Sequence, residues 1–302
     1  MNPARGITLK LISVVVFMAM TSLIKATADA VPPGEAIFFR SFFALPIVII
    51  MLAWTGHLND GLRIVNRRAH IIRGVVGATA MALVFFALRH IPLPEVVAIF
   101  FATPIFVTLL AAVMLGERLR MYRLGAIVLG LAGVLIIMSP RILSAEESTS
   151  DLKTIAAIAV FAGAFCAALA HVYVRKLMAT DSAASVSFWF ALFTTVLSLL
   201  SAPFGWVVPS WEVTGLLILA GLLGGIAQIF MTTAYKYAEA AVVAPFDYSQ
   251  IIFALLVGYF VFGELPTQIT LIGAALTIAA GLVIIWRERQ LGLARKNDTL
   301  RS

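Results

Sequence analysis

The chain has little of what soluble enzymes use, since it contains a single cysteine and only 12% of its residues are charged. Cys166 has no second cysteine, so neither an internal disulfide nor a cysteine metal site is possible within one chain, and we interpret it as a small packing residue. The sequence contains no HExxH motif, paired Cys/His set, phosphate-binding loop or Ser/His/Asp arrangement. It therefore predicts no enzymatic activity, no metal and no cofactor.

The shortage of charge also excludes a water-soluble fold. Soluble domains carry about 25% charged residues, whereas this chain of 302 residues is 62% hydrophobic, with a mean hydropathy of +1.02. Residues 1–6 lead into an apolar stretch that reaches Ile24 without a cleavage site, so we expect a retained first helix and not a signal peptide. The net charge of +7 does not indicate nucleic acid, because the basic residues follow the alternation of loops. The chain belongs in a membrane.

Ten apolar stretches are long enough to cross a bilayer core about 30 Å thick, which requires roughly 20 residues per helix. The predicted fold class is therefore an all-α polytopic membrane protein with ten transmembrane helices. Prolines fall near the ends of several stretches, where a missing N–H is tolerated. The predicted helices cover residues 8–28, 34–54, 70–88, 92–115, 121–139, 154–175, 183–204, 212–235, 240–262 and 267–286.

A polar segment at residues 141–153 divides these helices into two sets of five. We expect it to be a hinge loop between a first repeat over 1–140 and a second repeat over 154–286, followed by a basic tail over 287–302. Of the 22 Lys and Arg residues, 17 fall in one set of alternate loops and three in the other. The positive-inside rule then places both termini in the cytoplasm.

The two halves carry the same motif in the same place. Gly116-Glu117 ends the fourth predicted helix, and Gly263-Glu264 ends the ninth, 147 residues later. The glycines of the following helix keep the same order, with one inserted residue. An odd number of helices per repeat inverts the second half relative to the first, which is typical of secondary transporters whose site lies between the halves.

A Gly-Glu pair at the end of the fourth helix of each half, a glycine-spaced fifth helix and Arg40 in the second helix together form a recognisable pattern. Over nearly the whole chain it resembles the EamA branch of the drug/metabolite transporter superfamily. The resemblance implies a bacterial inner-membrane carrier of small organic solutes with a central cavity and cytoplasmic termini. Members include exporters of amino acids and other metabolites and importers of riboflavin and S-adenosylmethionine, and the first two helices resemble the riboflavin-importer group.

Asp247 is the strongest candidate for a site residue. It lies about seven residues into the ninth predicted helix, where a carboxylate costs several kcal/mol unless it faces protein or a wet cavity. Gln250 follows three residues later on the same helix face. Either the two side chains together bind the polar edge of a substrate ring, or Asp247 carries a coupling proton. The alternative is a structural hydrogen bond to a neighbouring helix.

Arg40 and Lys25 are the cations inside predicted spans. Arg40 is either an anion clamp, a partner for Asp247, or a side chain that snorkels to the headgroups. Lys25 lies near the outer end of the first helix, where snorkelling is favoured; if it points inward, it adds positive potential to the outer mouth.

Aromatic residues supply the remaining candidates. Phe100 is the repeat counterpart of Asp247, so a pocket with one apolar and one acidic wall would suit an amphipathic ring system. Tyr248 could stack on a planar substrate, although aromatic residues in such chains more often face lipid or the interface. The residues Gly116, Glu117, Gly263 and Glu264 are interpreted as scaffold, with each glycine allowing the chain to turn.

We therefore expect a secondary transporter that moves a small organic metabolite by alternating access, with riboflavin or a related flavin as the favoured substrate for uptake. An exporter of amino acids or other metabolites is the alternative within the same class. A membrane-embedded enzyme or assembly subunit is the alternative from another class, but it would need clustered catalytic groups that the sequence lacks. The expected partners are the substrate and the lipid bilayer, and the chain is compatible with a homodimer.

Overall fold

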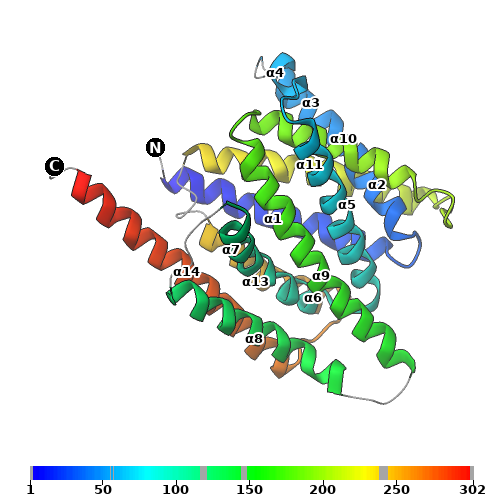
Figure 1. The fold of residues 1–302 in the computed structure, drawn as a ribbon. Coiled ribbons are helices and arrows are strands. Elements are labelled where there is room, and N and C mark those ends of the chain that lie inside the picture. The colour runs from blue at the N-terminus through cyan, green and yellow to red at the C-terminus, as the bar shows by residue number, and fades with distance from the viewer. Residues whose placement is uncertain are drawn as a thin grey trace.

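The computed structural model describes residues 3–54, 56, 58–115, 121–143, 148–237 and 244–299. Within these ranges the chain forms helices and no strand (Figure 1). In chain order they are α1 (Pro3–Thr27), α2 (Pro33–Phe42), α3 (Ala44–Trp54), α4 (Leu58–Leu62), α5 (Arg67–His90), α6 (Leu93–Phe100), α7 (Ala102–Leu115), α8 (Met121–Leu143), α9 (Ser148–Leu177), α10 (Ala183–Leu199), α11 (Trp211–Tyr237), η1 (Ala244–Ser249), α13 (Gln250–Phe262) and α14 (Gln268–Thr299).

The helices have the length and surface of membrane spans. In the described part of the chain, seven are long and apolar enough to cross a membrane, and three shorter apolar helices accompany them at Leu124–Pro140, Ala184–Leu199 and Phe246–Phe262. Large apolar side chains face outward; Trp54, for example, is 90% exposed and Phe260 is 76% exposed. Such a surface would be costly in water and suits lipid tails. The protein is an integral multi-pass membrane protein.

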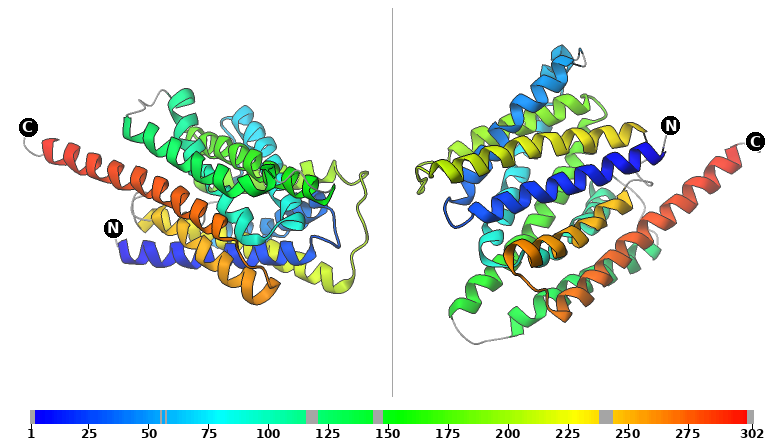
Figure 2. Two further views of the ribbon diagram at one scale, coloured as in Figure 1. Left: turned by 90° about the horizontal axis from the view of Figure 1, so that it is seen from below. Right: turned by 180° about the vertical axis from the view of Figure 1, so that it is seen from behind.

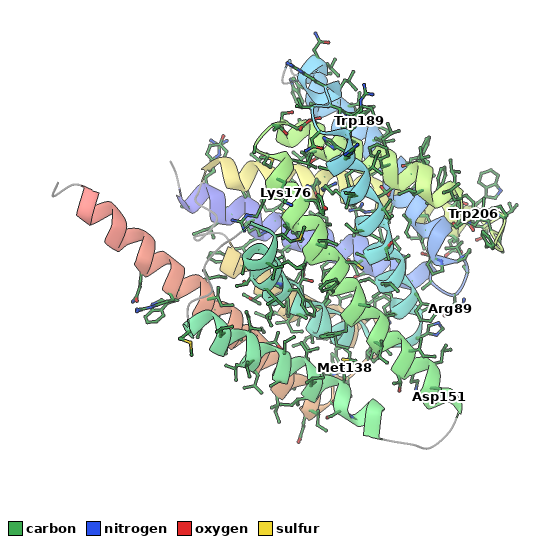
Figure 3. All side chains as sticks on the ribbon, in the orientation of Figure 1. Arg89, Met138, Asp151, Lys176, Trp189 and Trp206 are labelled. Carbon is green, nitrogen blue, oxygen red and sulfur yellow. The ribbon has the colours of Figure 1, made fainter. Side chains whose placement is uncertain are left out.

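The long helices run between two ends of the molecule. The first described helix, α1, begins at the same end at which the last one, α14, finishes (Figures 1 and 2). Arg89, Asp151 and Trp206 lie at the opposite end (Figure 3). The path of the chain from α1 to α14 therefore returns to the end where it started.

Three predicted helices are broken where we expected continuous ones. The helix predicted over 34–54 is divided into α2 and α3 at Phe43, and the helix predicted over 92–115 is divided into α6 and α7 at Phe101. The described part of the helix predicted over 240–262 starts with the 3₁₀ helix η1, which leads directly into α13.

Proline explains the break between α6 and α7. Pro104 has no N–H to donate to the carbonyl of Phe100, four residues earlier. Thr103 Oγ1 donates to that carbonyl instead, at 2.7 Å, so the carbonyl has a partner in a region where water cannot supply one. Pro46 stands at the same distance after the break at Phe43.

Helices of the first half pack against helices of the second. The most extensive packing joins α1 to α11, α5 to α9 and α8 to α14, and further contacts join α2 to α10 and α6 to α13. In the right-hand view of Figure 2, α1 lies between α11 and α13. Glycines allow a close crossing of α8 and α14, since a Cβ atom on Gly133 of α8 would lie 2.7 Å from the carbonyl oxygen of Gly273 of α14.

The close crossings occur in equivalent places in the two halves. Gly77 of α5 lies against the ring of Phe190 of α10. In the corresponding crossing, Gly224 of α11 lies against Arg40 of α2. Gly224 is the counterpart of Gly77, 147 residues later, and Arg40 is the counterpart of Phe190, 150 residues earlier. The same pair of packing positions therefore occurs twice, and each time it joins a helix of one half to a helix of the other.

The expected hinge and tail are more helical than their composition indicated. Helix α8 continues to Leu143 and α9 begins at Ser148, so much of the predicted loop at 141–153 is helix, while residues 144–147 lie outside the described ranges. Helix α14 continues to Thr299, so the basic segment after residue 286 prolongs the last helix.

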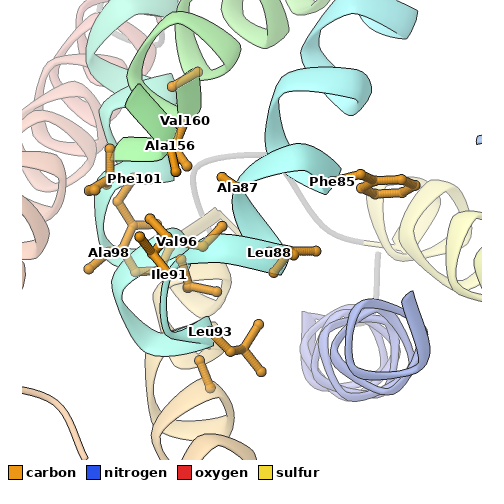
Figure 4. Packing of buried hydrophobic residues seen from close by; sticks show 14 of the residues in the cluster. Phe85, Ala87, Leu88, Ile91, Leu93, Val96, Ala98, Phe101, Ala156 and Val160 are labelled. Atoms are coloured by element: carbon orange, nitrogen blue, oxygen red, sulfur yellow. The ribbon is translucent and has the colours of Figure 1, made fainter. Parts of the chain in front are cut away.

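The main buried core surrounds the junction of α5 and α6. Leu88, Ile91 and Leu93 are each at most 2% exposed and pack in one cluster with Ala156 of α9 (Figure 4). In lipid the hydrophobic effect does not drive helices together, so close van der Waals packing carries more of the stabilisation. This packing fixes the N-terminal end of α6, which takes part in the site described below.

Gly133→Ala should destabilise the protein, because the new Cβ would lie within 2.7 Å of a backbone oxygen that cannot move away alone. We expect a loss of about 1–3 kcal/mol, as for other overpacked sites, measured by thermal or denaturant unfolding in detergent. Gly125→Ala is the matched control on the same helix, because nothing lies within 4 Å of its added Cβ. Equal stability of the two variants would contradict the glycine crossing.

Candidate functional site

The helix breaks of the two halves meet at the centre of the molecule. The rings of Phe101, between α6 and α7, and Tyr248, in η1, lie 5.3 Å apart at 58°. These residues are repeat counterparts, 147 positions apart. A side chain at Gly281 would overlap the Tyr248 hydroxyl, so this glycine makes room for the ring. Broken helices at the interface of two repeats are where secondary transporters place their binding sites.

Asp247 forms an ion pair with Lys10 of α1 across this centre, at 2.7 Å between Oδ1 and Nζ. The Lys10 side chain is 2% exposed, whereas that of Asp247 is 46% exposed. Lys10 is not a site candidate in the sequence analysis. It belongs to the 17 basic residues assigned to loops, although the predicted helix over 8–28 includes it. The cation at Asp247 is therefore Lys10, and no ion pair joins Asp247 to Arg40 in the described part of the chain.

Two arginines lie inside the bundle without a carboxylate partner among the described residues. Arg40 of α2 donates through Nη1 to Met81 Sδ at 3.6 Å, and its buried Nε has no partner. Arg73 of α5 is 9% exposed, and its Nε and Nη1 have none. The Arg73 guanidinium lies 4.0 Å from the Phe190 ring centroid. Arg73, like Lys10, was counted as a loop cation, although the predicted helix over 70–88 includes it.

The Lys10 pair and the arginines belong to one charged region. His171 of α9 lies close enough to both Arg73 and Lys10 to be affected by their charges, and Arg40 acts on Arg73 in the same way. The side chains of His171 and Asp247 are surrounded by protein and yet are accessible to water. Water can therefore reach part of this charged region, and we refer to that water-accessible part as the cavity.

Gln250 and Phe100 are the two other candidate residues. Gln250 is the first residue of α13, directly after the 3₁₀ turn that carries Asp247, and it is half-buried. Phe100 is also half-buried and packs on the main core at the end of α6.

Lys25 does not snorkel to the headgroups; it lies in a second ion pair. Its Nζ is 2.8 Å from Glu264 Oε1 and also donates to the carbonyls of Leu88 and Ile91, each at 3.1 Å. Glu264 Oε2 in turn accepts a bond from the backbone N–H of Leu93 at 2.8 Å. One lysine and one glutamate thereby join α1, the α5–α6 junction and the segment that follows α13.

Gly263 allows this arrangement by ending α13 in the left-handed conformation, with φ = 66°. The N–H of Glu264 then donates to the carbonyl of Gly258 at 2.7 Å, which closes the helix end in the manner of a Schellman motif. Gly116 and Glu117, the counterparts in the first half, lie outside the described residues.

Comparison with known proteins identifies the family. The model of the EamA-like transporter family matches the chain twice, over residues 4–139 and 154–286. The chain belongs to this family. Its EamA fold is also seen in a protein solved by crystallography, with a TM-score of 0.67 and 21% sequence identity over 94% of this chain and 98% of the other.

Named relatives of this EamA protein are transporters. It is 27% identical to a pseudopaline exporter of Pseudomonas aeruginosa, over 92% of this chain and 95% of the relative. It is also 27% identical to an S-adenosylmethionine uptake transporter of Rickettsia felis, over 97% of this chain and 96% of the relative. The relatives therefore include both an exporter and an importer of small metabolites.

Glu264→Gln in this EamA protein should remove the carboxylate that neutralises Lys25. Breaking a buried ion pair by removing one partner costs about 3–5 kcal/mol, so thermal unfolding in detergent should shift clearly downward. The double variant Lys25→Met/Glu264→Gln should recover part of the loss, since it leaves no unpaired charge. Asp29→Asn is the control, because its pair with Arg89 is largely exposed and such pairs contribute little. If Glu264→Gln is as stable as the control, the pair is not a structural link.

Proposed function

We propose that this EamA-like transporter is a ten-span secondary carrier, built from two inverted five-helix repeats, that moves a small organic metabolite by alternating access. Equivalent packing of the two halves and the meeting of their helix breaks support this reading. Chain ends on one side of the molecule are in keeping with an even number of spans. The charge asymmetry of the loops favours cytoplasmic termini in a bacterial inner membrane.

The ion pair between Lys10 and Asp247 is the observation that carries the proposed mechanism. Its carboxylate keeps 46% of the side-chain surface open to water, while its cation is almost fully covered. A proton or a cationic group that reaches Asp247 from the cavity would weaken its hold on Lys10. Because Lys10 belongs to α1 and Asp247 to η1, loading the site is thereby coupled to the contact between two helices from different halves.

The substrate class follows from the family and its relatives. Their names describe export of pseudopaline and uptake of S-adenosylmethionine, which supports transport of a metabolite in preference to an enzymatic role. Neither relative's name describes a flavin, so riboflavin uptake stays a prediction from the sequence alone. The half-buried aromatic residue Phe100 and the Phe101–Tyr248 ring pair are the features that favour a planar substrate.

Asp247→Asn and Lys10→Gln should each abolish transport while the protein still reaches the membrane, because each removes one member of the central ion pair. The measurement is uptake of labelled S-adenosylmethionine and riboflavin into membrane vesicles of both orientations, with Asp29→Asn as a control for an exposed acid. Full transport of either compound by both variants would remove the pair from the mechanism.

Growth rescue tests the prediction of riboflavin uptake. A riboflavin-auxotrophic bacterium without a flavin importer should grow at limiting riboflavin when it expresses the parent chain, and it should not grow with Asp247→Asn. Failure of the well-expressed parent to support growth would reject flavin uptake and leave the metabolite-exporter alternative.

A further inference from the structure

Arg40 and Arg73 differ from the other two cations that lie inside the bundle. Lys10 and Lys25 each have a carboxylate within 2.8 Å, on Asp247 and Glu264 respectively. The two guanidinium groups have only a thioether and an aromatic ring, and three of their buried nitrogen atoms have no hydrogen-bond partner. A buried charge without a counter-ion is costly, and the cation–π contact of Arg73 offsets only part of that cost.

The position of these arginines excludes a simple surface explanation. The Arg40 side chain extends inward to Met81 of α5, and its Nε lies 3.6 Å from where a Cβ on Gly224 of α11 would be. It therefore does not snorkel. Arg73 is 9% exposed and stands over Phe190 of α10. The two guanidinium groups also lie close enough to repel one another.

We propose that Arg40 and Arg73 together bind a carboxylate group of the transported metabolite, so that the substrate is an organic anion. This inference rests on the proposed transport function and narrows its substrate class. A guanidinium presents N–H donors in a planar fork that matches carboxylate oxygens. A bound carboxylate supplies the partners that the buried nitrogen atoms lack and separates two like charges by an opposite one.

The charge of the cavity favours a net negative substrate. Among the described residues, Asp247 is the acid beside these cations, and it is already paired with Lys10. Both guanidinium charges therefore remain to be neutralised. Two guanidinium groups suit the two oxygens of a carboxylate. An uncharged ring system such as riboflavin would leave both arginines as they are, so this inference favours an anionic metabolite over the flavin predicted from the sequence.

The first test needs no ligand. If the two arginines bind substrate and do not stabilise the fold, Arg73→Gln and Arg40→Gln should each unfold at the parent's temperature or a few degrees higher in ligand-free detergent solution. The reason is that each substitution removes a buried charge. Arg89→Gln is the matched control, since Arg89 is 44% exposed and lies at a helix end. A clear fall in unfolding temperature for both cavity variants would show a structural role and overturn the proposal.

The second test uses simple probes on the purified full-length protein. Succinate, citrate and benzoate should raise the unfolding temperature of the parent and of Arg89→Gln, and the shift should be lost in Arg40→Gln and Arg73→Gln. Arg73→Lys should keep only part of it, because lysine cannot form the bidentate contact. No shift with any carboxylate, or a larger shift with glucose 6-phosphate, would overturn the carboxylate assignment. Neither measurement requires transport, so a transport-inactive protein that shows arginine-dependent stabilisation would contradict the proposed function while still supporting a carboxylate site at Arg40 and Arg73.

Discussion

Inside a bilayer no water is available to satisfy a polar group, so every charge and every broken backbone bond must find its partner within the protein. This constraint explains most of the structure. The carbonyl freed by Pro104 accepts from Thr103, and Glu264 accepts from the N–H of Leu93 at the start of α6. The Lys25 ammonium is shared between a carboxylate and two carbonyls. Among the described cations, the constraint is not met at Arg40 and Arg73, where we propose that the substrate supplies the missing partners.

The same constraint limits how the two halves can meet. Helices that contact each other in lipid gain little from the hydrophobic effect and depend on close approach. Gly133 and Gly273 provide that approach for α8 and α14, and equivalent glycines on α5 and α11 receive α10 and α2. The equivalent positions hold Phe190 on α10 and Arg40 on α2. Equivalent helix packing therefore gives the centre of the molecule one aromatic wall and one cationic wall.

Hydrophobic length predicts the membrane class and the helical stretches, and motif spacing predicts the equivalence of the two halves. Both can be read directly from the sequence because they depend on residue type and position along the chain. The helix breaks do not follow in the same way, since Pro104 fixes only that a hydrogen bond is missing and not how the chain responds. Asp247, Arg40 and Lys25 stand out in sequence as charges in apolar surroundings. Their partners depend on which helices are neighbours, and this is a property of the tertiary fold.

The oversight of Lys10 and Arg73 has a specific physical cause. Both lie within a few turns of a helix start, where a long basic side chain can reach the headgroups, and sequence alone cannot separate that outcome from an inward one. Only the packing of α1 against η1, and of α5 against α10, directs these side chains to Asp247 and Phe190. A basic residue inside a predicted span is thus better treated as a site candidate than as a topology signal.

The two ion pairs also restrict how the transporter can move. Lys10 and Lys25 lie on α1, about 22 Å apart along a helix that rises 1.5 Å per residue. Their partners, Asp247 and Glu264, stand at the beginning and just past the end of the η1–α13 segment. The Lys10–Asp247 and Lys25–Glu264 pairs therefore fasten α1 to this segment at both ends. Separating the paired groups costs more than moving them together, so α1 and the η1–α13 segment, which carries Asp247, are expected to shift as one body. The second pair also holds the α5–α6 junction, so the shift is expected relative to α2, the wall that carries Arg40. A substrate that contacts both walls would be held across the moving interface, which is where binding energy can bias one state over the other.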